Sequence, residues 1–172
     1  SVLALNHRRL RRPSHLGAGI LTCLTSLSHL YANDMASRKK GHILNVASLA
    51  AWMAIPNQNV YAATKAYVLS FTQALADELK AANSGVVASA LCPGYTATKM
   101  MDNPDQGAKL SIAPNMMMSA KEVAEAGIKG CLAGKSAIVP GAANKVTAAI
   151  TRLFSKARLT RLVGSFYRNN MG

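Results

Sequence analysis

The chain has 172 residues, half of them hydrophobic, and a formal net charge of +13 from 20 Lys or Arg against 7 Asp or Glu. This length and composition predict one globular domain with a buried core and exclude a disordered chain. No apolar run approaches the roughly 18 residues of a membrane-spanning helix, so none is predicted.

The three cysteines and four histidines are scattered along the chain. Their spacing matches neither a disulfide framework nor a set of metal ligands, which indicates buried thiols in a reducing compartment. No apolar stretch of signal-peptide form follows the basic N-terminus. We therefore expect a cytoplasmic protein without a metal site.

The first segment, residues 1–22, is unusually basic, and its clustered arginines have no acid beside them. They are Arg8, Arg9, Arg11 and Arg12. Basic arms of this kind bind nucleic-acid backbones in some proteins. Because no aromatic residues alternate with these arginines, no nucleic-acid partner is expected.

The next elements follow one another with clear boundaries. Helical periodicity predicts a helix from Leu21 to about Met35, and the apolar run His42–Ala47 predicts a buried strand. A loop over residues 49–59 leads into a long helix, Val60–Ala82, which the turn residues 83–85 end. The chain thus alternates between helix and strand.

A second strand, Val86–Leu91, ends at Pro93-Gly94. Ser119 and Glu122 have the spacing of a capping box and predict the start of another helix. Ala137–Val139 is a short last strand. Strands that alternate with helices predict an α/β protein with a parallel sheet.

Ser48, Tyr61 and Lys65 lie at the ends of these elements and form a candidate proton-transfer set. Tyr61 and Lys65 are four residues apart on the predicted helix and share a face. Free tyrosine titrates near pH 10, so acid–base work near neutrality requires about 4 kcal/mol of stabilisation of the phenolate. An ammonium about 4 Å away supplies about 4 kcal/mol at an effective dielectric constant of about 20. The alternative is a purely structural pair, because a Tyr and a Lys at this spacing are common.

The surroundings of these residues, from about 24 to 141, resemble the short-chain dehydrogenase/reductase family. NVAS at Asn45–Ser48, YAATK at Tyr61–Lys65 and LCPGYTAT at Leu91–Thr98 are similar to three family motifs, in the family's order. The resemblance implies a partial Rossmann-like, doubly wound parallel sheet that lacks its first strands. It also implies an NADP- or NAD-dependent oxidoreductase that transfers a hydride between the cofactor and a carbonyl or alcohol substrate.

The resemblance also assigns a role to each motif residue. Tyr61 donates and accepts the proton, Lys65 stabilises the phenolate and binds the nicotinamide ribose, and Ser48 positions the carbonyl. Residues 99–118 become the substrate lid, whose methionines suit an apolar substrate or ordinary packing. The residues implied at the nicotinamide end are Tyr61, Lys65, Pro93, Gly94, Thr96 and Thr98.

The family's glycine-rich TGxxxGxG-like turn and its NNAG-like turn do not occur in this sequence. Gly17-Ala18-Gly19 is the nearest match, but no apolar strand precedes it. Ile20 falls where many members have a catalytic asparagine. We therefore expect the isolated chain to bind NADPH at millimolar affinity or weaker. We expect residues 1–22 to be a misread frame or an incorrect exon; the alternative is a genuine divergent N-terminus.

These observations divide the chain into a basic segment (1–22), the C-terminal part of a Rossmann domain (23–145) and a basic amphipathic tail (146–172). The tail suits an anionic membrane surface. The alternative is a helix that packs on its own domain or on a partner subunit. The tail residues with helical spacing are Val146, Ala149, Ile150, Leu153 and Ala157.

Two classes of function remain open. The first is the oxidoreductase, with a small-molecule carbonyl or alcohol as partner and a homo-oligomer formed by the helices near 21–36 and 61–82, as the resemblance implies. It is expected in the cytoplasm, with peripheral membrane contact through the tail. The second is a non-catalytic remnant that acts as an interaction or membrane-surface module.

Overall fold

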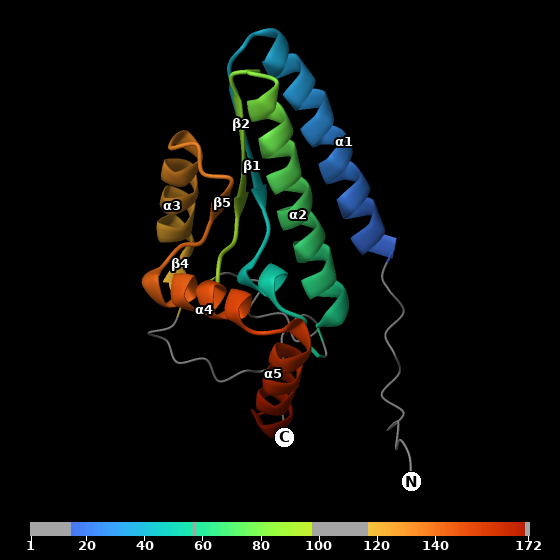
Figure 1. Cartoon of the computed structure of the whole chain (residues 1–172), viewed down its shortest axis with the longest axis vertical. Helices are drawn as coiled ribbons and strands as arrows, with labels where there is room; N and C mark the ends of the chain where they lie inside the picture. The colour runs from blue at the N-terminus through green and yellow to red at the C-terminus, as the bar shows by residue number, and fades with distance from the viewer. Residues whose placement is uncertain (1–14, 57, 98–116, 171–172) are drawn as a thin grey trace.

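The computed structural model describes residues 15–56, 58–97 and 117–170 (Figure 1). The helices are α1 (His15–Ser37), the short 3-10 helix η1 (Leu49–Trp52), α2 (Asn59–Ala81), α3 (Ala120–Leu132), α4 (Ala142–Leu153) and α5 (Lys156–Asn170). The strands are β1 (Gly41–Val46), β2 (Val86–Leu91), β3 (Thr96–Ala97), β4 (Met118–Ser119) and β5 (Ala137–Ile138). The helices and strands predicted from residue 21 to residue 139 are present.

The main sheet is parallel and has the strand order β1-β2-β5. Gly41 pairs with Val86 at one end of β1 and Val46 with Leu91 at the other, while β5 pairs with the end of β2. A second, two-stranded parallel sheet joins β3 to β4. Within the described residues, β1 has a strand neighbour on one side only. The predicted parallel α/β architecture is therefore present as a partial sheet.

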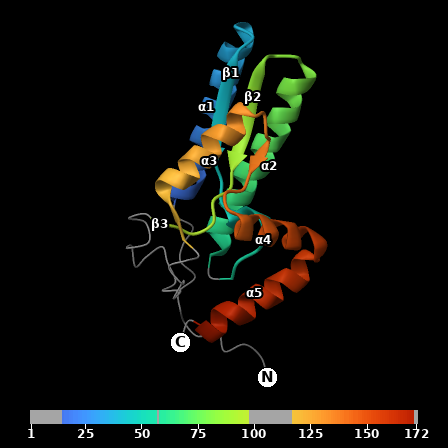
Figure 2. The ribbon, with the colours of Figure 1, turned by 90° about the vertical axis from the view of Figure 1, so that its left-hand side faces the viewer.

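Helices cover both faces of this sheet (Figures 1 and 2). On the α1–α2 face, Ile43 of β1 packs with Leu75 and Leu79 of α2. On the opposite face, Val123 and Cys131 of α3 belong to a second buried cluster with β2 and β5. Burial on both faces explains why the strands have continuous apolar runs rather than alternating ones.

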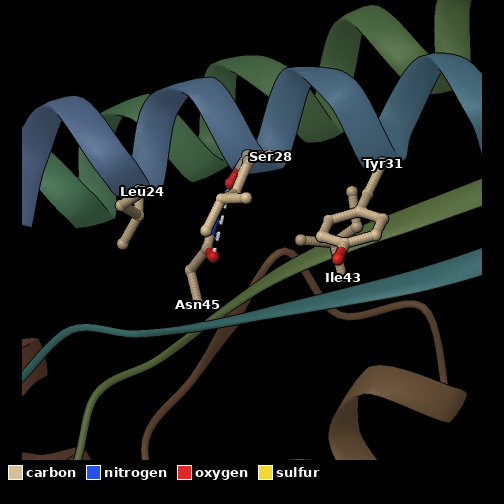
Figure 3. Close-up of a pocket in the computed structure, with 6 residues that line it drawn as sticks. Leu24, Ser28, Tyr31, Ile43 and Asn45 are labelled. Carbon is tan, nitrogen blue, oxygen red and sulfur yellow. Dashed lines mark hydrogen bonds between the residues drawn. The ribbon is translucent and has the colours of Figure 1, made fainter.

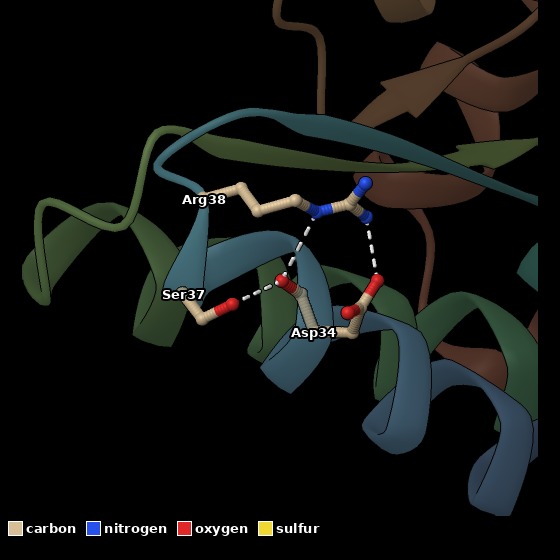
Figure 4. A network of polar contacts seen from close by, with 3 residues as sticks. All are labelled: Asp34, Ser37 and Arg38. Atoms are coloured by element: carbon tan, nitrogen blue, oxygen red, sulfur yellow. Dashed lines mark hydrogen bonds and ion pairs between the residues drawn. The ribbon is translucent and has the colours of Figure 1, made fainter.

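The end of α1 is closed by a polar network around Asp34 (Figure 4). The Ser37 hydroxyl and the Arg38 guanidinium both donate to the Asp34 carbonyl oxygen, and Arg38 also pairs with the Asp34 carboxylate. The turn that follows packs against Gly85, which has a φ of 73°. A Cβ at Gly85 would lie 2.0 Å from the Lys39 carbonyl oxygen, so only glycine fits here. The two turns place the starts of β1 and β2 side by side.

Two expectations are corrected by the fold. Cys23 of α1 is exposed, so it is not one of the buried thiols that the sequence predicts. The tail is not one continuous helix from Val146 to Ala157, because Phe154 is extended and separates α4 from α5. The Ser155 carbonyl oxygen accepts a hydrogen bond from the Leu159 amide and so helps to start α5.

Several expectations fall on residues that the structure does not describe. They concern the arginine cluster at 8–12, Thr98, and the segment 99–116 of the expected lid. The capping box of Ser119 and Glu122 is present as predicted. No helix in the described parts of the chain is both long and apolar enough to cross a bilayer.

Candidate active site

The predicted site residues gather where β1 and β2 end and α2 begins. Ser48 follows β1 directly and caps η1, because its hydroxyl oxygen accepts a hydrogen bond of 3.1 Å from the Ala50 amide. A serine hydroxyl still has one proton to donate after accepting such a bond. Ser48 is therefore held in place by its own turn and retains a donor for a carbonyl oxygen.

Tyr61 and Lys65 lie one turn apart at the start of α2, as the sequence predicts. The Lys65 ammonium nitrogen is 5.9 Å from the centroid of the Tyr61 ring. The same nitrogen donates a 3.0 Å hydrogen bond to the Val46 carbonyl oxygen, at the end of β1. Tyr61 remains 42% exposed, so its phenol is accessible from outside the domain. Lys65 thus connects the tyrosine's helix to the strand that leads into Ser48.

Burial shifts the pKa values of Lys65 and of the neighbouring Cys92 thiol. It lowers the pKa of Lys65, an effect that the neighbouring Cys92 opposes. It raises the pKa of the Cys92 thiol to about 11, against the opposing effects of Trp52, the Ser48 backbone and Lys65. The Trp52 N–H lies beside this thiol without a hydrogen bond of normal geometry. Near neutral pH the thiol is uncharged, so the ammonium is the charged group of this pair.

The Pro93-Gly94 loop lies next to the serine's turn. The Leu49 amide donates a 2.7 Å hydrogen bond to the Pro93 carbonyl oxygen, and the Thr96 hydroxyl donates to the Gly94 carbonyl oxygen. A Cβ at Gly94 would lie 2.4 Å from the Asn144 side chain of α4. The structure therefore brings three of the predicted nicotinamide-end residues to the edge of the sheet that carries Ser48, while Thr98 lies outside the described residues.

The sequence analysis missed a buried polar network beneath this site (Figure 3). The Asn45 side-chain amide donates to the hydroxyls of Ser28 on α1 and Thr72 on α2, at 3.2 and 3.0 Å. Together with Ile43 and other residues, Asn45 and Ser28 line a cavity of about 320 Å³ between α1 and β1. A single amide within an otherwise apolar strand was the available signal. The network positions β1, and hence Ser48, relative to both helices.

A second contact that the sequence analysis missed joins the tail to the serine's turn. The Arg152 guanidinium of α4 lies 4.4 Å from the centroid of the Trp52 ring in η1. Val163 of α5 packs beside a small buried cluster that includes Ala50 and Ala62, the residue after Tyr61. The tail is thus packed against the segment that carries Ser48 and Tyr61. No local pattern signals contacts across such sequence distances.

Comparison with known proteins gives a family match and partial relatives. Residues 20–109 match the family model described as short chain dehydrogenase. The 3-oxoacyl-[acyl-carrier-protein] reductase of Synechocystis sp. is 40% identical over 85 residues, 49% of this chain and 32% of the relative. A ketoacyl reductase of Nostoc sp. is 31% identical over 133 residues, 77% of this chain and 45% of the relative. The matches span less than half of these relatives.

Solved structures resemble the chain over more than three quarters of its length. A short-chain dehydrogenase from Sphingobium yanoikuyae in complex with NADPH has a TM-score of 0.61 at 25% identity, over 77% of this chain and 52% of that one. A 7beta-hydroxysteroid dehydrogenase has a TM-score of 0.65 at 22% identity, over 79% and 52%. These likenesses confirm the predicted Rossmann-like fold.

Proposed function

Since the chain belongs to the short-chain dehydrogenase family, we propose that it contains the proton-transfer residues and the substrate-binding part of an oxidoreductase. This enzyme would transfer a hydride between NADP or NAD and a carbonyl or alcohol. The observation that carries the proposal is the Lys65 ammonium, 5.9 Å from the Tyr61 ring and bonded to the strand end beside Ser48. An accessible phenol, a fixed cation and a fixed hydroxyl together suit proton transfer at a carbonyl oxygen.

In the direction of reduction, Tyr61 donates its phenolic proton to the substrate oxygen. The nearby Lys65 ammonium stabilises the phenolate that remains, and this stabilisation is effective because the site is partly desolvated. Ser48 donates a hydrogen bond to the same substrate oxygen and holds it near Tyr61. In oxidation the proton moves back from the alcohol to Tyr61. The bound nicotinamide supplies or accepts the hydride.

The residues present fit the nicotinamide end of such a cofactor. Lys65 uses one N–H for the Val46 carbonyl, and an ammonium has three donors, so the others are available to ribose hydroxyls. Tyr61 lies beside it. We propose Pro93, Gly94, Thr96 and Thr98 as the loop that lines the nicotinamide. The NADPH bound by the Sphingobium relative supports a nicotinamide cofactor and leaves the choice between NADP and NAD open.

The substrate class follows from the relatives. Their printed names include 3-oxoacyl-[acyl-carrier-protein] reductase, acetoacetyl-CoA reductase and, in Bos taurus, very-long-chain 3-oxoacyl-CoA reductase. We propose a ketone carried on an apolar chain as the substrate. The methionine-rich segment 99–118 is the proposed lid over it, since methionine adapts to apolar shapes of varied form.

We also propose an oligomeric state, a cellular location and a membrane contact for the protein. A homo-oligomer would use α1 and α2, where Leu30 of α1 and Tyr67 of α2 are exposed although apolar or aromatic. We propose a cytoplasmic location, with the basic tail (146–172) in peripheral contact with a membrane. The division into a basic segment (1–22), a Rossmann part (23–145) and this tail remains a proposal as well.

The first test is to titrate NADPH into the 172-residue chain. We expect millimolar affinity or weaker, because the sequence has no glycine-rich pyrophosphate turn, and charged hydrogen bonds of this kind are worth about 1.5–3 kcal/mol each. Micromolar binding would contradict this expectation. A chimera that places the N-terminal part of the Synechocystis reductase ahead of residue 20 should bind NADPH tightly and oxidise it with a 3-oxoacyl substrate.

The chimera also separates the two classes of function. Tight NADPH binding without turnover on any ketone tested would contradict the enzyme proposal. That result would favour the alternative, a non-catalytic remnant that serves as an interaction module.

A further inference from the structure

The side of α4 that faces the domain is built from small and polar residues spaced four apart. The Asn144 side chain donates a 2.8 Å hydrogen bond to the Pro140 carbonyl oxygen, Ala148 is buried, and Arg152 lies over the Trp52 ring. Residues four apart lie on one face of a helix. These three contacts fix the rotation of α4 about its axis.

The outward side of α4 is apolar as a result. Val146 is 59% exposed and Leu153 is 80% exposed, with Ile150 exposed between them. Phe154, where α4 ends, is exposed as well. A surface helix ordinarily buries its apolar stripe and exposes its polar one. The apolar stripe of α4 therefore faces outward, while the tail packs on its own domain through other residues, among them Ala148 and Leu159.

The part of the sequence that contains this stripe is basic and has no acid. From Lys135 to Gly172 the sequence has no Asp or Glu, and its basic residues are Lys135, Lys145, Arg152, Lys156, Arg158, Arg161 and Arg168. Arg152 is placed over Trp52, whereas Lys145, Lys156 and Arg158 are exposed. We call the outward apolar residues with these three cations the elbow surface; its apolar members are Val146, Ile150, Leu153 and Phe154.

The helices that form the elbow surface pack on the rest of the domain. On the α5 side, Leu159 is buried, and Val163 packs beside the cluster that includes Ala50, Ile55 and Ala62. Each helix thus has a side-chain contact with the segment around η1. The elbow surface is presented by the packed domain and does not need a separate folding step.

We propose that the elbow surface binds a membrane rich in anionic lipid. Its apolar side chains enter the boundary between headgroups and acyl chains, and its cations bind the lipid headgroups. This inference rests on the peripheral membrane contact proposed above for the tail and gives it a surface and a lipid class; it does not depend on the oxidoreductase activity. A second copy of the chain is the less suitable occupant. A symmetric pair places the same cations against each other, and no acid in this part of the sequence neutralises them.

The test is co-sedimentation of the 172-residue chain with lipid vesicles. We expect binding to phosphatidylcholine vesicles containing about 30% phosphatidylserine to be at least about tenfold tighter than binding to phosphatidylcholine alone, and to weaken with salt. The variants I150S/L153S and K156E/R158E should each lose about tenfold or more. The matched controls on α3, I128S/L132S and K121E/K129E, change the same number of exposed apolar or basic residues and should bind as the parent does.

Circular dichroism and light scattering complete the design. The elbow variants should keep the parent's helix content, because the changed residues are exposed. Absence of vesicle binding, equal binding to neutral vesicles, or equal losses in the α3 controls would overturn the proposal. A change from dimer to monomer in the elbow variants, with vesicle binding unchanged, would also overturn it and identify a second copy as the occupant.

Discussion

Replacing Tyr61 with phenylalanine is expected to lower the rate of carbonyl reduction about 10²–10⁴-fold, the usual contribution of a positioned general acid. The substitution removes only the phenolic hydroxyl, so the chain should keep its fold and the chimera should keep its affinity for NADPH. The measurement is the turnover of the chimera beside a titration of NADPH. A loss of turnover at unchanged cofactor affinity identifies Tyr61 as the proton donor.

The matched control is Tyr67→Phe, two turns further along α2. Tyr67 is 39% exposed, close to the value for Tyr61, and its hydroxyl forms a 2.7 Å hydrogen bond with Thr25 on α1. Its loss should change stability slightly and turnover hardly at all. Equal losses of turnover in the two variants would mean that α2 tolerates no change of this kind, and would contradict a specific role for Tyr61.

Replacing Lys65 with methionine should lower turnover by about 10²-fold or more, because the phenolate loses its cation. The same change should leave stability at pH 7 unchanged or raise it. Burial lowers the pKa of Lys65 in the folded state below its ordinary value of 10.5. Between the lowered pKa and 10.5 the unfolded lysine binds more protons than the folded one, so the contribution of Lys65 to stability rises with pH in that window. The Cys92 thiol, whose pKa burial raises from 9.0 to about 11, contributes in the opposite direction at the upper end of the window.

Urea unfolding between neutral pH and about pH 10.5 measures this difference. The free energy of unfolding of the parent relative to Lys65→Met should increase with pH, because both chains keep Cys92 and only the parent has Lys65. Lys80→Met, at an exposed site near the end of α2, should behave as the parent does. A Lys65→Met variant that is much less stable than the parent at pH 7 would show that the lysine serves the fold. Such a result would contradict a role for Lys65 that is limited to stabilising the Tyr61 phenolate.

The local elements could be predicted from the sequence because their signals are local. β2 begins and ends where predicted, and the bounds of β1 and α2 lie within one residue of the prediction. The apolar run of β1, the turn residues after α2 and the capping box at Ser119 each act within a few residues. The relative placement of Ser48, Tyr61 and Lys65 could be predicted for the same reason, because these residues lie at the ends of these elements.

The rest could not be predicted because it depends on contacts between distant residues. The hydrogen bonds of Asn45 with Ser28 and Thr72 require α1, β1 and α2 to be packed first. The rotation of α4 depends on the contact of Arg152 with Trp52, 100 positions earlier in the chain. Periodicity identified the apolar stripe of α4 but continued it across the break at Phe154. It could not show that the stripe faces outward.

The most direct test of the account is to follow the hydride itself. The chimera would be supplied with NADPH in which both hydrogens at the nicotinamide C4 position are replaced by deuterium, together with a 3-oxoacyl substrate, and the product alcohol would be analysed by mass spectrometry. We expect deuterium at the carbinol carbon with the parent residues, and little product with Tyr61→Phe in the same time. A product without deuterium, or equal deuterated product from the variant, would contradict a reductase site built on Ser48, Tyr61 and Lys65.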